Sequence, residues 1–247
     1  MIITSMSVKG FNEYGKRSIE SWLEHTPFDI TIYYEDAPFD FGDEMRIEQK
    51  PLYHIGGVEE FYEHIQTNPR FKGLFEDDNG KEFYNYMYDV NKFSRKTFAV
   101  TDFGLSYKKP FCWMDADVIA TKPLENPEEW LTTLLDGQYL AYLGRQWSYS
   151  ECGFMAFDPS HPSNKLVMNL MKNCYLNGTF TQLNYWTDCH VFDAVRTIVG
   201  VPCNNLAEGL KTNHPFIESV LGKNFDHLKG PERKKIGHSP ELMEKTA

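Results

Sequence analysis

The opening of the chain restricts its fold more than any other feature, because strand-like, helix-like and strand-like segments follow one another there. Ile2 to Val8 is short, apolar and rich in β-branched residues. Apolar side chains then recur at helical spacing from Phe11 to about His25, and Asp29 to Tyr34 is strand-like again. Two strands joined by a crossover helix lie parallel in one sheet, so this order predicts an α/β fold.

Later segments continue the alternation. We predict helices at residues 59–66, 91–107, 161–176 and 188–199, and strands at residues 111–114, 138–144, 153–157 and from 201 onward. The tail from Phe225 onward is polar and basic, and glycine and proline interrupt its regularity. We find no internal repeat and no flexible linker, so residues 1–247 are predicted to form a single domain with a mixed, mainly parallel sheet flanked by helices.

The composition excludes several classes of partner. Hydrophobic residues make up 41% of the 247 residues and charged residues 24%, which suits a packed core. The formal net charge is −10, so the chain has no general attraction to nucleic acid or to anionic lipid, and neither is expected as a partner. A phosphate-bearing ligand would need local cations or a bound metal ion.

The five cysteines are widely spaced and form no C-x-x-C pair, so they indicate neither a zinc site nor a disulfide framework. Reduced thiols and a cytoplasmic location are the expected state. The first ten residues lack the pattern of a secretory signal. No run of residues is long and apolar enough to predict a membrane span.

Asp115 and Asp117 follow directly after the predicted strand at residues 111–114. Ligands of open α/β sheets bind where the strands end, so both carboxylates are expected at such an edge. Oxygen ligands of this kind suit Mg²⁺ or Mn²⁺. A D-x-D string is also common in solvated loops. Here apolar segments flank it on both sides, and two acids in such a place are costly unless they are paired or bind a metal.

The strand, the D-x-D motif after it and a basic helix before it resemble the GT-A glycosyltransferases. The resemblance covers most of the chain in element order, but only short motifs are specific. It implies a GT-A (Rossmann-like) fold whose nucleotide-binding part spans about residues 1–120 and whose acceptor-binding part spans about residues 121–247. It also implies metal-dependent transfer of a sugar, with a hexose favoured, from a nucleotide-diphosphate sugar to a hydroxyl group. A UDP-sugar is the favoured donor, and a glycan, a protein or a small molecule would be the acceptor.

On the donor side, the resemblance makes Thr4 and Ser5 contacts to the nucleotide base. Arg95 or Lys96, on the basic helix, would reach the diphosphate, although a solvated helix face explains that basic cluster equally well. Asp115 and Asp117 would hold the Mn²⁺ or Mg²⁺ ion.

The end of the chain resembles the retaining, glycogenin-like branch, in which a late histidine completes the metal site and a lysine binds the diphosphate. His227 would be the third metal ligand, and Lys229 and Gly230 would contact the diphosphate. Lys234 is a second candidate for the diphosphate contact, and His238 is an alternative metal ligand. The Asp-Gln-Asp helix start of that branch is absent, so the resemblance leaves retention or inversion open.

Two acidic residues are candidates for the acceptor side. Glu151 opens a segment that resembles the acceptor-binding strand of the family, where it would bind a sugar hydroxyl or act as a base, and Gly153 would allow close approach of a sugar. Asp188 would activate the acceptor in an inverting enzyme or contact the donor sugar in a retaining one. As an alternative, Thr187 and Asp188 also make a good helix start.

Residues 37–90 are less regular and rich in Tyr, Phe and Glu, which suggests a lid or an insertion. Within them, we interpret the aromatic run from Phe83 to Tyr88 as part of the core, with stacking on a sugar or a base as the alternative.

Two other functions remain as alternatives. A nucleotidyltransferase can share a carboxylate pair at a strand end, but it would usually carry a glycine-rich basic loop after the first strand, and residues 7–10 supply little of one. A catalytically inactive module that binds a nucleotide sugar would retain the same motifs.

Overall fold

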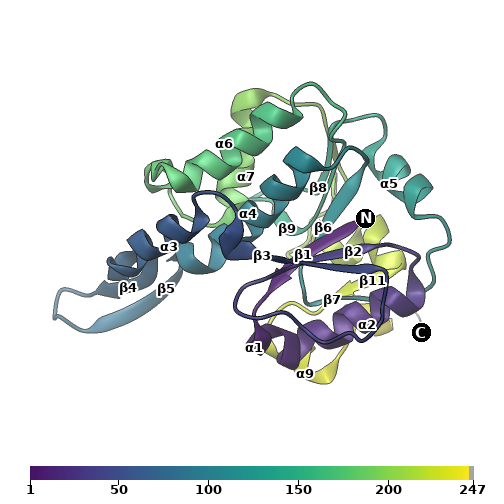
Figure 1. The fold of residues 1–247 in the computed structure, drawn as a ribbon, viewed down its shortest axis with the longest axis horizontal. Coiled ribbons are helices and arrows are strands. Elements are labelled where there is room, and N and C mark those ends of the chain that lie inside the picture. Colours follow the sequence, from purple (N-terminus) through teal and green to yellow (C-terminus); the bar gives the residue numbers. More distant parts are fainter. Residues whose placement is uncertain (245–247) are drawn as a thin grey trace.

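A central sheet organises the computed structural model, which describes residues 1–244 (Figure 1). Within the described residues it has seven strands, which from one edge to the other are β10 (Cys203–Asn205), β8 (Leu140–Leu143), β9 (Glu151–Phe157), β6 (Phe111–Met114), β1 (Ile2–Met6), β2 (Ile30–Tyr34) and β3 (Ile47–Pro51). Neighbouring strands are parallel, except that β9 runs antiparallel to both β6 and β8. The predicted α/β class with a mixed, mainly parallel sheet is confirmed.

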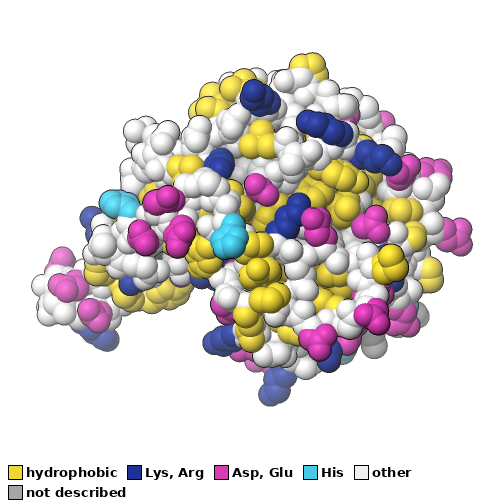
Figure 2. Space-filling model, viewed as in Figure 1, with side chains coloured by type: hydrophobic (Ala, Val, Ile, Leu, Met, Phe, Trp, Pro, Cys, Tyr) yellow, Lys and Arg dark blue, Asp and Glu magenta, His cyan; other side chains and the backbone are white. Residues whose placement is uncertain are grey.

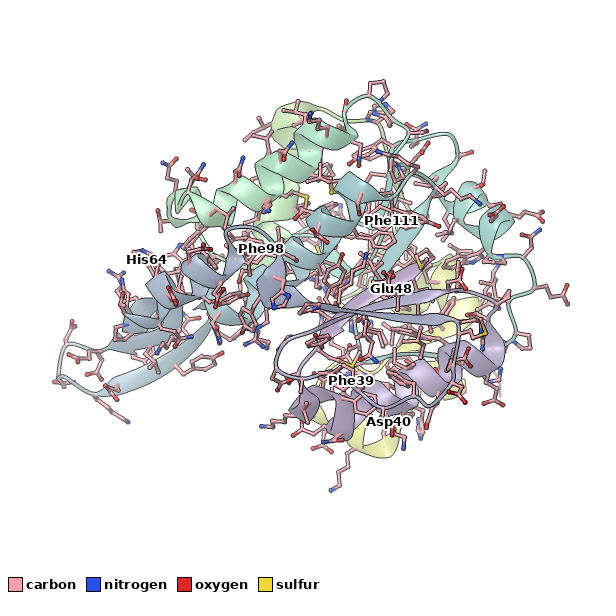
Figure 3. The ribbon with its side chains drawn as sticks, viewed as in Figure 1. Phe39, Asp40, Glu48, His64, Phe98 and Phe111 are labelled. Atoms are coloured by element: carbon pink, nitrogen blue, oxygen red, sulfur yellow. The ribbon has the colours of Figure 1, made fainter. Side chains whose placement is uncertain are left out.

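Helices cover both faces of this sheet. In chain order they are α1 (Val8–Gly10), α2 (Lys16–His25), α3 (Val58–Gln66), α4 (Val90–Ser106), α5 (Pro127–Leu135), α6 (Asn164–Leu176), α7 (Asp188–Val199), α8 (Pro215–Glu218), α9 (Pro231–Ile236) and α10 (Pro240–Glu244). The helices α3, α4, α6 and α7 pack in one apolar cluster, which includes Phe98 of α4 and Phe111 of β6 (both labelled in Figure 3). The helices α2, α5 and α8 pack in a second cluster on the other face.

The strands alternate between these two clusters, as their two-residue period requires. In β6, the side chains of Phe111 and Trp113 join the first cluster, and those of Cys112 and Met114 join the second. All four are buried, which explains why the segment is apolar throughout. The chain therefore leaves the core only at residue 115.

A small second sheet of two strands begins just after the chain leaves the core at residue 115. The strand β7 (Val118–Ala120) follows the D-x-D segment and pairs antiparallel with β11 (Phe225–His227). All three residues of β11 are buried. The tail from Phe225 onward is polar in composition, yet pairing with β7 buries even Asp226 and His227.

An arm formed by β4 (Lys72–Glu76) and β5 (Glu82–Asp89) projects from the body beside α3 (Figure 1). Phe83, Tyr84 and Tyr86 are exposed on it. The interpretation of the run from Phe83 to Tyr88 as core was therefore wrong for these three rings, whereas Tyr88 packs against the first apolar cluster. A two-stranded hairpin has no layer on its outer face, so these rings stay in solvent however apolar the segment is. The arm lies within residues 37–90, for which a lid or an insertion stays a prediction.

Candidate functional site

Three residues from two distant parts of the sequence converge where β6 ends. His227 Nε2 lies 3.2 Å from Asp117 Oδ1 and 3.8 Å from Asp115 Oδ2. One potential ligand atom from each of the three residues lies within 4.8 Å of the other two. The sequence predicted this set, and the structure brings its members together.

Backbone pairing places His227 in this set. The register of β11 on β7 sets His227 opposite Val118, and the Leu228 amide donates to the Asp117 carbonyl at 2.9 Å. Gly153 makes room for the imidazole, because a Cβ atom at residue 153 would lie 2.5 Å from His227 Cε1. The lack of a side chain at Gly153 therefore leaves space for His227, whereas the sequence suggested that a sugar would occupy this space.

Two lysines hold the carboxylates of the set. Lys96 Nζ lies 2.7 Å from Asp115 Oδ1 and 2.8 Å from Asp188 Oδ2, and Lys234 Nζ lies 2.9 Å from Asp117 Oδ2. Burial lowers the pKa of Lys96, but Asp115 and Asp188 raise that pKa by more, so the side chain stays charged. Lys96 thus links the D-x-D segment to the start of α7, where Thr187 is the N-cap residue.

The same charges set the ionisation of Asp117 and His227. Burial raises the pKa of Asp117, but His227 and Lys234 lower this pKa by more, so the carboxylate is ionised. Burial lowers the pKa of His227, and Asp117 and Glu151 raise it by more. A metal ion that bound at Nε2 would have to displace the proton that this pKa favours.

Glu151 is a second buried carboxylate, and it is surrounded by cations. It forms ion pairs with Arg145 and Lys229, and its Oε1 lies 3.9 Å from His227 Nδ1. Burial raises the pKa of Glu151, but His227, Lys229 and Arg145 lower that pKa by more, to about 2. The sequence gave no signal for Arg145, since only the fold brings the loop after β8 against Glu151.

These groups line one cavity of about 900 Å³ at the carboxyl ends of β1 and β6. The predicted site residues that line it are Ser5, Arg95, Lys96, Asp115, Asp117, Glu151, Asp188, His227, Lys229, Gly230 and Lys234. Thr4 does not, because its side chain is fully buried in β1. His238 also lies outside the lining, so the structure favours His227 over His238 at the D-x-D segment.

One predicted residue of the cavity lining already forms an ion pair, and several other lining residues were not predicted from the sequence. Arg95 forms an ion pair with Glu35, which the sequence did not single out. Tyr14 was also missed, and its ring lies 4.1 Å from Lys234 Nζ. Tyr86 and Tyr149 complete another part of the wall. Tyr14 lies in the segment of helical spacing that starts at Phe11, and only the structure identifies it as a cavity residue.

Two features of the structure, the state of the cysteines and the character of the helices, bear on the location of the protein. All five cysteines carry free thiols. Across residues 1–244, no helix has the combination of length and apolar character that crossing a membrane requires. The cytoplasmic location stays a prediction.

The comparisons with known proteins concern the fold. The sequence matches no protein-family model and no curated protein. Among solved structures, the apo bifunctional glycosyltransferase WbbM aligns with a TM-score of 0.54 and 10% identity over 98% of this chain and 50% of that one. An active-site variant of LgtC aligns with a TM-score of 0.50 and 12% identity over 99% of this chain and 95% of that one. The chain thus spans about half the length of WbbM and nearly all of LgtC. These likenesses confirm the predicted GT-A glycosyltransferase fold.

Proposed function

We propose that this protein is a metal-dependent glycosyltransferase that moves a sugar, with a hexose favoured, from a nucleotide-diphosphate sugar to an acceptor hydroxyl. The observation that carries the proposal is the convergence of Asp115, Asp117 and His227 inside a cavity that Lys229 and Lys234 also line. A cavity of about 900 Å³ lies within the range of small-molecule sites and suits a ligand of this size. The similarity in fold to the two solved glycosyltransferases supports the same proposal.

The donor atoms fit a divalent ion. Two carboxylates and one imidazole within 4.8 Å supply the oxygen and nitrogen ligands that Mn²⁺ accepts. Mg²⁺ favours oxygen ligands more strictly, so the imidazole favours Mn²⁺. A bound ion would neutralise charge on the diphosphate as it leaves.

The cations of the site would act on the same diphosphate. Lys229 and Lys234 lie at the cavity wall on the segment after β11, next to the cluster formed by Asp115, Asp117 and His227. Both can turn from their carboxylate partners to phosphate oxygens, as charge-assisted donors do. Ser5 at the end of β1 would contact the nucleotide base. Arg95 also lines the cavity, where it forms an ion pair with Glu35.

The two remaining carboxylates, Glu151 and Asp188, would have different roles on the acceptor side of the cavity. With a pKa of about 2, Glu151 is a weak proton acceptor near neutral pH, so it would accept hydrogen bonds from a sugar hydroxyl. Asp188 is buried at the start of α7 and paired with Lys96. It would either orient the donor sugar or receive the proton of the acceptor hydroxyl.

Hydrolysis of the donor tests this function without a known acceptor. Thermal shift with Mn²⁺ would first rank UDP- and GDP-sugars, and the released products would then be identified. We expect a free sugar and a nucleoside diphosphate, with release that needs Mn²⁺ and is lost in Asp117→Ala. Asp136→Asn is the matched control, because Asp136 is exposed and in the left-handed conformation that Asn tolerates.

The other outcomes separate the alternatives. Formation of pyrophosphate from a nucleoside triphosphate and a sugar 1-phosphate, with no hydrolysis of any sugar nucleotide, would indicate a nucleotidyltransferase. Metal-independent binding with no turnover of any donor would indicate an inactive binding module.

A further inference from the structure

The arm carries aromatic rings that the proposed chemistry does not use. Phe83, Tyr84 and Tyr86 of β5 are 47%, 54% and 51% exposed. Figure 2 shows hydrophobic side chains along the lower edge of this arm. Packing does not explain rings in these positions, because such large apolar groups are usually covered.

A continuous series of rings connects the arm to the cavity. Tyr149 lines the cavity, and its ring centroid lies 4.5 Å from that of His190. We call the whole series the aromatic band, and from the cavity outward its members are Tyr149, His190, Tyr185, Tyr88, Phe75 and Phe83. Successive centroids after the first pair are 5.1, 5.6, 5.2 and 5.8 Å apart. The band thus runs without a break from the cavity to the tip of the arm.

The base of the arm is fixed against the body. The Trp186 amide donates to the Met87 carbonyl at 2.9 Å, and the Tyr88 hydroxyl donates to the Asn184 carbonyl at 3.1 Å. Tyr86 also lines the cavity, so the arm forms part of its wall. Rings held in this way keep their places before a ligand arrives, which lowers the entropy that binding costs.

The negative charge around the aromatic band disfavours two classes of ligand. Glu76, Asp77, Asp78 and Glu82 lie around the turn of the arm, with Lys81 among them. These acids and the net charge of −10 disfavour nucleic acid and anionic membranes. Exposed rings with hydroxyl groups at their edges suit a neutral ligand that has apolar faces and polar edges, and a sugar ring has both.

We propose that the aromatic band binds an extended saccharide acceptor, whose reacting end enters the cavity while its following sugars lie along the arm. This inference rests on the proposed function and names its acceptor class. Tyr185, which is 38% exposed and outside the cavity lining, would stack on a sugar distant from the reacting one.

Binding of saccharides of two lengths tests the inference. The probes are disaccharides and pentasaccharides of the cello, malto, laminari and chito series, measured by saturation-transfer NMR and titration with UDP and Mn²⁺ present. For at least one series, we expect the pentasaccharide to bind about tenfold more tightly than the disaccharide. Tyr185→Ala should remove most of that difference.

Controls make the result specific to the band. Tyr107→Ala changes a tyrosine that packs on Phe103 and lies outside the band, and it should leave the length dependence intact. Tyr185→Phe keeps the ring and should keep most of the affinity.

Equal affinity for both lengths in every series, or no binding of any probe, would overturn the inference. So would a Tyr185→Ala variant that remains folded and retains the preference for length. If the wild-type protein hydrolyses no donor, the proposed function fails instead, and that result is read independently of saccharide binding.

Discussion

Two walls of the same cavity differ in composition and in how they are held. The charged wall consists of Asp115, Asp117, His227, Lys96 and Lys234, and every charge on it has a partner of opposite sign. The aromatic wall consists of Tyr86 and Tyr149, which are supplied by the arm and by the loop before β9. The charged wall is partly buried and is linked to the core through His227, whereas the aromatic wall continues into exposed rings. The difference matches the two roles that we propose, in which the first wall performs chemistry at a fixed point and the second accommodates a substrate of variable length.

The largest effect is expected from the centre of the charged wall. Asp117→Ala removes a ligand candidate and the partner of both His227 and Lys234. Donor hydrolysis should fall on the order of 10²- to 10³-fold, as it does when one preorganised electrostatic contact is lost. Initial rates at saturating Mn²⁺ measure this, and a variant with more than half of the wild-type rate would contradict the role given to Asp117.

The position of His227 is tested without changing a charge. In Gly153→Ala the new Cβ would lie 2.5 Å from His227 Cε1, in a fully buried place. We expect a loss of stability of about 1–3 kcal/mol from overpacking, together with weaker Mn²⁺ binding. Denaturant unfolding and Mn²⁺ titration measure the two effects.

Gly104→Ala is the matched control for that substitution. Its Cβ would lie 2.8 Å from Met168 Cε, the end of a flexible side chain, and Gly104 is inside the helix α4. Relief of the helix penalty offsets the contact, so the change in stability should stay below about 1 kcal/mol. If both variants lose the same stability, the close packing of Gly153 on His227 has no special role.

A smaller effect should appear with pH next to the charged wall. Burial and the neighbouring His227 lower the pKa of His214 to about 4, while its ordinary value is 6.5. The unfolded chain therefore binds the proton first, and this contribution to stability is lost as the pH falls from about 6.5 to about 4. The loss is about 2–3 kcal/mol. Unfolding free energies across this range should fall less steeply in His214→Gln, and an equal slope would contradict the pKa.

The smallest effect is expected at the tip of the arm. Phe83 is 47% exposed and stacks only on Phe75 among the rings of the described residues. Phe83→Ser should change the free energy of unfolding by no more than about 0.5–1 kcal/mol, as surface positions do. A loss several times larger in denaturant unfolding would show that the arm is part of the core, and the contrast between the two walls would weaken.

The sequence predicted the charged wall better than the aromatic one, for physical reasons. Asp115 and Asp117 follow a fully apolar strand, and this transition is visible in the residue order. His227 required the resemblance to a family, because no local pattern reveals that β11 pairs with β7. Arg145 and Tyr86 reach the cavity only through the fold.

One further residue and one segment show what periodicity in the sequence cannot predict. Thr4 occupies the expected strand, but its side chain points into buried structure, since alternation does not tell which face meets a cavity. The run from Phe83 to Tyr88 has the composition of a core segment, and only its place in a two-stranded hairpin exposes Phe83, Tyr84 and Tyr86.

The most direct test of the account is Mn²⁺ binding measured by electron paramagnetic resonance with and without UDP. If the ion bridges Asp115, Asp117 and His227 to the diphosphate, UDP should strengthen Mn²⁺ binding by at least about tenfold, and Asp117→Ala and His227→Ala should abolish that gain. UDP binding that is the same with and without Mn²⁺, together with unchanged Mn²⁺ affinity in both variants, would contradict the central claim.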